Sequence, residues 1–490
     1  MSKFGSKLGA LIAQSGSNKY HFSNESGVDR VMLYRFINGD RVPGTDSFEK
    51  ICKALRISPT EKKELLELYD IARIGEGIYE RRLLVKKLVN QINSLHMEQR
   101  PATAHKSVIV DGLEDTVKVV SGNYNVNVLV RGVLDDLAYN AQPKRIWTNA
   151  PFECAFLFDH LRQLYFETNG TIEIEHAVAF ARNAGSHSNP NINLETLANV
   201  LPFVFCEGIG YRPGYYYSDS MKYDSVFMPY YLFTEKRLLL LSADCNTAML
   251  INDASAIRAC RAEFDALQTT PMFRYINSLE EILEAYLDVW THTKNPDSIF
   301  IEAQPCIVCH TTEDMIEKCI RKELPDRDAI MQALIRHIEF GKSAKAHGYF
   351  TVDGLEDFLE SGYAMYTPTQ TVLPFDIADR LSLLKSFRDD AASGESEAYA
   401  INPAEISVAL NTSVSLFTNS MLLFAILNES GMRMCVIDEP SIYDAFYDFL
   451  QNLHDTKCVY SKQETLDILD KYIEKAEQAA AGGLSPAAQF

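Results

Sequence analysis

The first 75 residues carry apolar side chains at helical spacing in five successive stretches. Positions three and four apart are apolar while those between them are polar, the pattern of helices with one buried face. The predicted helices cover residues 3–15, 18–25, 29–38, 46–55 and 61–73. We therefore predict an all-α N-terminal domain of five helices over residues 1–75.

The stretch from Glu76 to Leu95 keeps the helical period, with apolar residues again three and four apart. Such a helix is either a dimerisation helix or a linker helix packed on the following domain. Residues 97–106 include Pro101 and are typical of a linker, so we assign 76–106 as a linker or dimerisation segment.

Beyond residue 106 helical and alternating patterns are mixed. Alternation or short apolar runs predict strands at 125–130, 171–180, 226–233, 238–242 and 247–251. Helical spacing predicts helices at 152–166, 193–205, 253–267 and 279–290. The short turns between the last three strands favour antiparallel pairing. We interpret 107–300 as one α+β domain that can serve as a sensor.

The last third repeats this mixture. Helices are predicted at 313–341, 353–361, 376–392, 439–453 and 461–480, and strands at 397–401, 414–417, 422–427 and 433–437. Residues 301–478 are therefore a second α+β module, followed by a disordered tail at 479–490. The predicted fold class is a multi-domain chain, an all-α head before a large mixed α+β region.

Residues 17–39 predict two short helices joined by a tight turn. Ser17 or Asn18 can cap the first helix, because a short side-chain oxygen accepts from free amides at a helix start. Gly27 suits the left-handed conformation of the turn. Asp29 can cap the second helix, and Asn38-Gly39 is a typical helix end.

A helical wheel divides the second of these helices into two faces. Met32, Leu33, Phe36 and Ile37 lie on one side and form a core stripe. The other side carries Arg30, Val31, Tyr34, Arg35 and Asn38. Arginine and small apolar groups on one helix face suit the major groove, where they meet guanine acceptors and thymine methyl groups.

This segment resembles the XRE-type (lambda-repressor-like, Cro-like) helix-turn-helix family of bacterial-type transcriptional regulators. The resemblance covers about the first 75 residues and rests on Phe22, Ser23, Gly27-Val28, Leu33, Phe36 and Asn38-Gly39. It implies a five-helix fold, double-stranded DNA as partner and a homodimer that binds two half-sites.

Three positions depart from the family pattern. Asp29 replaces a hydroxyl residue, Lys19 a Gln and Ile37 a Glu. We expect Asp29 to cap its helix rather than contact DNA, because an acid next to phosphates is unfavourable. The alternatives are a helical hairpin with no nucleic-acid role, or an adaptor module that binds a protein.

Charge is distributed unevenly along the chain. Residues 1–100 contain 17 basic and 12 acidic residues, a net charge of +5. The remainder of the chain contains 30 basic and 54 acidic residues, a net charge of −24. A basic head gains from releasing phosphate counterions, whereas an acidic body repels DNA. Arg41, Lys50 and Lys53 are either further phosphate contacts or solvated surface.

Four motifs suggest other chemistry, and we interpret each as structural. Cys306-Ile-Val-Cys-His310 matches a haem-attachment pattern, but we interpret it as a chance match. Gly208 to Gly214 departs from the dinucleotide fingerprint and reads as a loop. The tyrosines from 211 to 231 either line a small-molecule pocket or belong to a strand packed on a helix. His176 and His292 lack a second ligand at metal or catalytic spacing.

The apolar stretches are too short for membrane spans or a secretory signal, and we expect a cytoplasmic protein with no membrane partner. In that compartment the ten cysteines should be reduced thiols.

The sequence thus predicts a sequence-specific DNA-binding transcriptional regulator. Arg30, Val31, Tyr34 and Arg35 would read bases, and Lys19 and Asn38 would position the backbone. The acidic region would sense an unknown small-molecule or protein effector, or hold the dimer. We predict no catalytic residue, metal or cofactor. The alternative is an enzyme of unknown class whose head autoregulates its gene or targets it to DNA.

Overall fold

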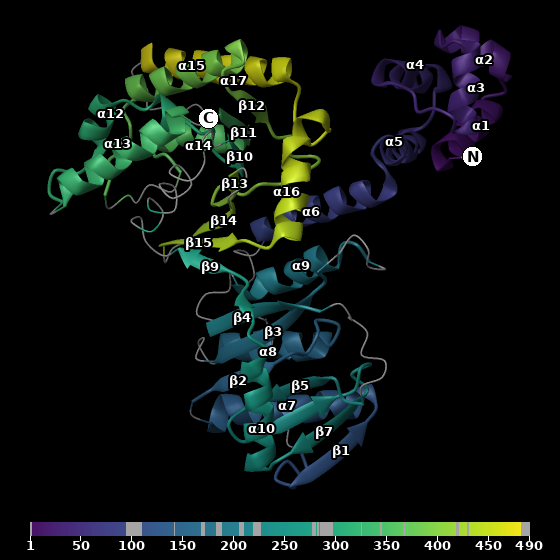
Figure 1. Ribbon diagram of the computed structural model, residues 1–490. Helices are drawn as coiled ribbons and strands as arrows, with labels where there is room; N and C mark the ends of the chain where they lie inside the picture. Colours follow the sequence, from purple (N-terminus) through teal and green to yellow (C-terminus); the bar gives the residue numbers. More distant parts are fainter. Residues whose placement is uncertain are drawn as a thin grey trace. The chain divides into compact units, whose positions relative to one another are not determined.

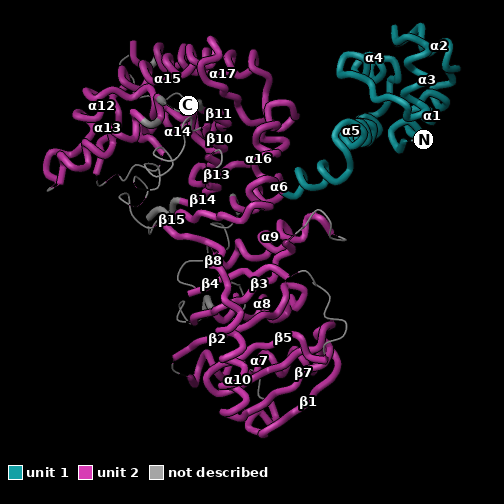
Figure 2. Tube along the Cα trace, viewed as in Figure 1, with its two compact units in different colours: residues 1–84 teal, residues 85–490 magenta. Residues whose placement is uncertain are grey.

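The computed structural model of the chain (Figure 1) has helices alone at the N-terminus and mixed helices and strands after them. It describes residues 2–94, 110–141, 143–167, 172–182, 189–204, 210–218, 227–276, 281, 284, 297–324, 326–343, 345–365, 369, 371–417, 421–428 and 431–481. The chain divides into two compact units, unit 1 at Met1–Leu84 and unit 2 at Val85–Phe490 (Figure 2).

Unit 1 is built from helices. Their bounds are α1 Lys3–Gln14, α2 Lys19–Ser26, α3 Arg30–Asn38, α4 Thr45–Leu55, α5 Pro59–Ile74 and the start of α6 Glu76–Ser94. Their apolar stripes meet in one core, which contains Leu8, Phe22, Leu33, Ile51 and Leu65 among others. The helical N-terminal region predicted from residue spacing is therefore present.

The start of α5 shows how sequence signals set a helix end. The Ser58 hydroxyl accepts from the Glu61 amide, and the Glu61 carboxylate accepts from the Ser58 amide. Pro59 occupies the first helical position, where its missing N–H costs no hydrogen bond.

Unit 2 contains two mixed sheets among its described residues. The first has the strand order β1-β7-β6-β5-β2-β3-β4-β8. Its strands are β1 Val117–Ser121, β2 Arg145–Thr148, β3 Glu173–Phe180, β4 Gly210–Tyr217, β5 Tyr230–Phe233, β6 Leu238–Leu241, β7 Thr247–Ile251 and β8 Thr270–Pro271. β2, β3 and β4 run parallel, and the other pairs are antiparallel. The described helices of this part of the chain include α7 Asn123–Asn140, α8 Ala155–Glu167, α9 Ile192–Val204 and α10 Ala254–Ala266.

The second sheet has the order β12-β11-β10-β13-β14-β15-β9. Its strands are β9 Arg274–Ile276, β10 Asp297–Glu302, β11 Lys345–Phe350, β12 Glu397–Ala400, β13 Thr412–Phe417, β14 Met421–Asn428 and β15 Gly431–Ile437. β10, β11 and β12 are parallel, and the rest are antiparallel. The sheet thus takes strands from both sides of residue 300, where the sequence placed a domain boundary. The helical segments here are η3 Val308–His310, α12 Glu313–Cys319, α13 Arg327–Ser343, α14 Val352–Ser361, α15 Ile377–Ser393, α16 Pro440–Gln451, η4 Leu453–Asp455 and α17 Lys462–Ala481.

One apolar core joins the two sheets of unit 2. It contains buried residues of α8 and β3 together with residues of β13, β14 and α16. The second half of α6 also enters this core through Val85, Leu88, Val89 and Ile92. These four side chains are covered by unit 2 itself, so they are not a free surface for a second copy.

Most predicted elements beyond residue 106 are confirmed within a few residues. They are α8, α9, α10, β3, the antiparallel strands β5 to β7, and β12 to β15 with α14 to α17. The predicted linker 97–106, most of the predicted helix 279–290 and residues 482–490 of the tail lie outside the described residues. The predicted start of the tail at 479 is wrong, because α17 continues to Ala481.

Three further predictions are wrong. Residues 125–130 belong to helix α7, whose buried Val126, Leu129 and Val133 recur at helical spacing beyond the short alternating window. The segment read as a loop contains β4 from Gly210 onward, paired in parallel with β3. The single helix predicted at 313–341 is two helices, α12 and α13, because the backbone becomes extended at Ile320. Strands β1, β2, β9, β10 and β11 were not predicted.

The structure also corrects the prediction that all cysteines are thiols. Cys154 and Cys245, 91 residues apart, form a disulfide, with Cα atoms 6.2 Å apart. Both cysteines are buried in the core of unit 2. None of the described helices is both long and apolar enough to cross a membrane.

Candidate nucleic-acid interface

The helix–turn–helix of residues 18–39 is held by side chains that cap its helices. The Asn18 carboxamide oxygen accepts from the Tyr20 and His21 amides, each at 3.0 Å. Gly27 ends α2 in the left-handed conformation, with φ of 67°. Asp29 accepts from the Met32 amide at 3.0 Å and so caps α3, as predicted. Gly39 ends α3 with φ of 83°.

Two buried hydroxyls add contacts inside the turn. Ser23 donates to the Val28 carbonyl at 2.6 Å, which ties α2 to the residue just before α3. Ser26 donates to the Phe22 carbonyl at 2.8 Å. Buried hydroxyls need such partners, so this pair fixes the path of the chain between the two helices. In the sequence, Ser23 and Ser26 are recognisable only as two small residues, and their hydrogen bonds were not predicted.

Helix α3 is anchored to unit 1 by its apolar side. Leu33, Phe36 and Ile37 are buried, and Met32 packs beside them half-buried. Helix α1 approaches the end of α3 closely at Gly5, where an added Cβ would overlap the Ile37 carbonyl oxygen and lie 2.8 Å from that of Phe36. This approach sets the angle of α3 and is invisible in the sequence.

The opposite side of α3 is exposed. Arg30, Val31, Tyr34, Arg35 and Asn38 all face solvent, with 60% of Val31 and 37% of Tyr34 accessible. An apolar valine so exposed has no packing role in unit 1. The division of α3 into two faces follows the helical wheel.

Cations and aromatic rings gather between α2 and α3. The Lys19 ammonium lies 4.9 Å from the Tyr34 ring centre, and the Arg30 guanidinium lies 5.8 Å from the same ring. Arg30 also lies 5.6 Å from the ring of Tyr20, which is 54% exposed. The structure therefore joins Lys19 to the residues of α3 and adds Tyr20, which the sequence reasoning missed. The only sequence signal for Tyr20 was that it directly follows Lys19.

Basic residues outside α3 differ in their surroundings. Lys50 is paired with Asp46 at 2.7 Å, so its charge is partly balanced within α4. Arg41 and Lys53 are exposed. The Asp29 carboxylate is engaged by the helix start it caps. The exposed face of α3 therefore offers cations, a ring and an apolar group together.

No group of three or more metal-ligating side chains occurs among the described residues. Cys306, Cys309 and His310 lie near η3 and form no such group. His176, in contrast, is a satisfied core residue, as the sequence indicated. Its two ring nitrogens lie 2.8 Å from the Tyr211 hydroxyl and 2.9 Å from the Ala150 carbonyl oxygen. His292 lies outside the described residues.

The described tyrosines of the tyrosine-rich segment lie on strands β4 and β5. Tyr211, Tyr215 and Tyr217 belong to β4, and they contact the core of unit 2. Of the two interpretations offered by the sequence, the described tyrosines of β4 therefore support the packed strand.

Comparison with known proteins assigns no family. No protein-family model and no curated protein matches the chain. Phosphatidylserine synthase from Haemophilus influenzae is similar over 80% of this chain and 98% of its own, at 9% identity and a TM-score of 0.24. TrmBL2, an archaeal chromatin protein, is similar over 43% of this chain and 69% of its own, at 11% identity and a TM-score of 0.19. Likenesses at these scores carry no argument about fold or function.

Proposed function

We propose that this chain is a sequence-specific DNA-binding transcriptional regulator of the XRE type. Unit 1 is the reading head, with the five-helix lambda-repressor-like fold over residues 1–75. Arg30, Val31, Tyr34 and Arg35 contact base edges in the major groove. Lys19 and Asn38 contact the backbone and set the register.

The observation that carries this proposal is the exposed face of α3. A helix capped at both ends and buried on one side presents two arginines, a ring and a solvated valine on the other. Arginine forks onto guanine O6 and N7, and apolar groups contact thymine methyl groups. The exposed side of α3 therefore carries the kinds of side chain that recognise bases in the major groove.

The charge distribution supports the same function. The head carries a net charge of +5 over residues 1–100 and the rest of the chain −24. DNA is therefore attracted to the head and repelled by the body.

We propose that the chain acts as a homodimer in the cytoplasm. Two copies of α3 about 34 Å apart would enter successive turns of the major groove, and the operator would then be a palindrome. The body would hold the dimer or sense an effector. We assign it no catalytic role.

The first experiment is selection of bound sequences from random duplexes by the full-length chain at 50 and 200 mM salt. Enrichment of a palindrome, with affinity falling steeply with salt, is expected. Enrichment of no sequence at either salt would overturn the proposal and favour a protein-binding head.

Arg35→Ala sharpens the test, with Lys62→Ala on α5 as the charge-matched control, since both side chains are exposed. If Arg35 reads a guanine, its loss costs about 1–3 kcal/mol and relaxes preference at one base position. Lys62→Ala should leave that preference unchanged. Equal losses in both variants on every operator would contradict base reading by Arg35.

A further inference from the structure

Unit 2 contains a cavity of about 240 Å³ on one face of its second sheet. Its walls include residues of β10, β13, α12 and α13 and of the segments 304–311, 362–365 and 372–375. Most of them are apolar, including Phe300, Ile316, Leu334, Ile338 and Phe417. Its volume lies just below the roughly 300–1,000 Å³ of common ligand pockets, so only a small ligand fits it.

The sheet face under the cavity is more polar than a core face. On β10 the alternate residues Ser298, Phe300 and Glu302 line the cavity, while Ile299 and Ile301 between them are in the apolar core. Successive side chains on a strand point to opposite faces, so the alternation places the serine and the carboxylate on the cavity side.

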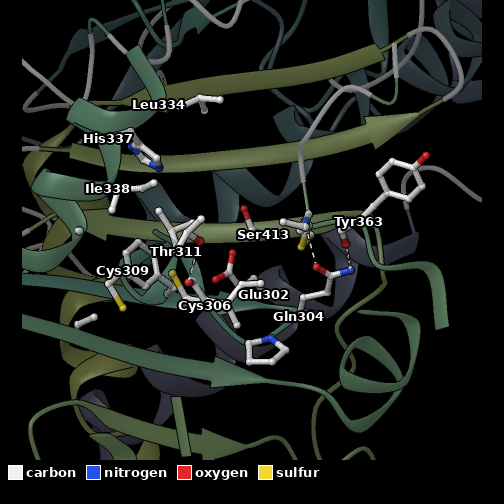
Figure 3. A pocket seen from close by; sticks show the side chains of 18 of the residues that line it. Glu302, Gln304, Cys306, Cys309, Thr311, Leu334, His337, Ile338, Tyr363 and Ser413 are labelled. Atoms are coloured by element: carbon white, nitrogen blue, oxygen red, sulfur yellow. Dashed lines mark hydrogen bonds between the residues drawn. The ribbon is translucent and has the colours of Figure 1, made fainter. Parts of the chain in front are cut away.

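The neighbouring strand β13 follows the same rule. Ser413 and Ser415 line the cavity, and they pair with Glu302 and Phe300 of β10. Ser298, Ser413 and Ser415 are 1%, 3% and 4% exposed. Figure 3 shows Glu302 and Ser413 extending into the same space. A carboxylate and three buried hydroxyls therefore lie beside Phe300 and Phe417 on this face of the sheet.

No arginine or lysine is among the described residues that line the cavity, so Glu302 faces no basic chain there. Burial raises the pKa of Glu302 to about 7, opposed by its hydrogen bond with the Cys306 thiol. Burial lowers the pKa of His337 on the opposite wall to about 4, so that imidazole is neutral at pH 7. Burial also raises the pKa of Cys306 and Cys309, which stay thiols.

Gln304 holds one wall of the cavity in place. Its amide donates to the Asp357 carboxylate at 2.7 Å and to the Tyr363 carbonyl at 3.2 Å. Its carbonyl oxygen accepts from the Met365 amide at 2.8 Å. Three hydrogen bonds from one buried side chain fix the segment that faces Glu302, so the cavity is formed before any ligand enters.

We propose that this cavity binds a small, mainly apolar amine, whose ammonium group lies against the Glu302 carboxylate and whose apolar part lies against Phe300 and Phe417. The cation supplies the charge that the lining lacks, and the serine hydroxyls of β13 accept its remaining N–H groups. The idea that such an amine is the effector of a transcriptional regulator rests on the proposed function. Binding itself is measured without DNA, so either proposal can fail alone.

The test uses the full-length chain and three matched probes, 2-phenylethylamine, 2-phenylethanol and phenylacetate, by isothermal titration calorimetry at pH 7. The amine should bind about 10- to 100-fold more tightly than the alcohol, since a hydrogen bond between charged groups exceeds a neutral one. The carboxylate should not bind. Equal binding of amine and alcohol, or binding of no probe, would overturn the proposal.

Proton exchange gives a second readout. An ammonium ion stabilises ionised Glu302, so binding at pH 7 should release up to about half a proton per amine. Titrations in buffers of different ionisation enthalpy measure this number. Proton uptake would overturn the proposal, because it would mean that the neutral carboxylic acid donates to the ligand.

Three variants localise the effect. Glu302→Gln should abolish proton release and weaken binding of the amine at least about tenfold. It should leave binding of the alcohol nearly unchanged. Asp297→Asn, which removes a carboxylate from the same strand outside the cavity lining, should change neither. Ser415→Leu fills the cavity and should abolish binding of both probes. Amine binding that survives Ser415→Leu in a chain with unchanged circular dichroism would place the site elsewhere and contradict the proposal.

Discussion

The Lys19 ammonium lies 4.9 Å from the centre of the Tyr34 ring, so a side chain of α2 is held against the exposed face of α3. Arg30 approaches the same ring to 5.8 Å. Two cations that share one ring repel each other, and an anion beside them relieves that repulsion. Under the proposed function, this arrangement would favour a DNA phosphate beside Lys19, next to Arg30 and Tyr34, which are proposed to read bases.

Tyr34 should therefore contribute to DNA binding through its ring. Tyr34→Ala is expected to cost about 1–3 kcal/mol of operator binding, and Tyr34→Phe much less, because phenylalanine keeps the ring. Fluorescence anisotropy with the selected operator measures both. The free energy of unfolding should change by less than about 0.5 kcal/mol in either variant, since the side chain is partly exposed. A Phe variant as weak as the Ala variant would contradict a role for the ring.

The approach of α1 to α3 at Gly5 should make that position intolerant of a methyl group. Gly5→Ala forces the added Cβ onto the Ile37 carbonyl and should destabilise unit 1 by about 1–3 kcal/mol. Hydrogen–deuterium exchange in the α1 and α3 peptides of the full chain should become faster. Gly77→Ala is the control, because a Cβ there meets no atom within 4 Å and alanine favours helix. Slower or unchanged exchange in Gly5→Ala would contradict the close approach.

Buried His176 should make the stability of unit 2 depend on pH. Burial lowers its pKa to about 4, below the 6.5 of a free histidine. The unfolded chain therefore binds a proton first as the pH falls, and stability is lost between pH 6.5 and 4. The loss from this residue is about 3 kcal/mol. Urea unfolding followed by tryptophan fluorescence at pH 7, 6 and 5 measures it.

His176→Gln should flatten that dependence, because glutamine hydrogen bonds without titrating. His337, whose pKa burial also lowers to about 4, keeps part of the slope. An unaltered slope in His176→Gln would show that folding does not lower the pKa of His176 and would contradict the prediction.

The Cys154–Cys245 disulfide should stabilise unit 2 through the 91-residue loop that it closes. Loop closure of this length is worth about 4.6 kcal/mol in the chain-entropy model. The double variant Cys154→Ala/Cys245→Ala should lower the midpoint of unfolding, and dithiothreitol should then have no further effect. Cys260→Ala, at a free half-buried cysteine, is the control. A wild-type chain whose midpoint does not respond to reductant would contradict the prediction.

Sequence patterns predicted the turn and the two faces of α3 because every signal involved is local. Asn18, Gly27 and Asp29 act on amides within three residues, and burial along α3 follows its own period. The close approach at Gly5 was not predictable, because it depends on a carbonyl 32 positions away. Tyr20 was missed since its significance comes from Arg30 on the next helix.

The distinction between local signals and contacts between distant residues also applies to unit 2. Residues 125–128 alternate between polar and apolar and residues 128–130 are all apolar, and only the longer run of α7 shows the helical period. Glu302 and Ser413 share a register across two strands that no short window connects. The pair Cys154 and Cys245 likewise becomes recognisable only when α8 and the β6–β7 turn are in place.

The order of strands in the second sheet also determines when it can form during synthesis. The strands of the first sheet are complete by Pro271, but β9 must wait for its partner β15, which ends at Ile437. At about 5–20 residues per second, the ribosome needs roughly 10–30 seconds to add the intervening stretch. Throughout that interval the nascent chain holds β9 without its antiparallel neighbour β15, so an unpaired strand edge stays open to contact with other chains.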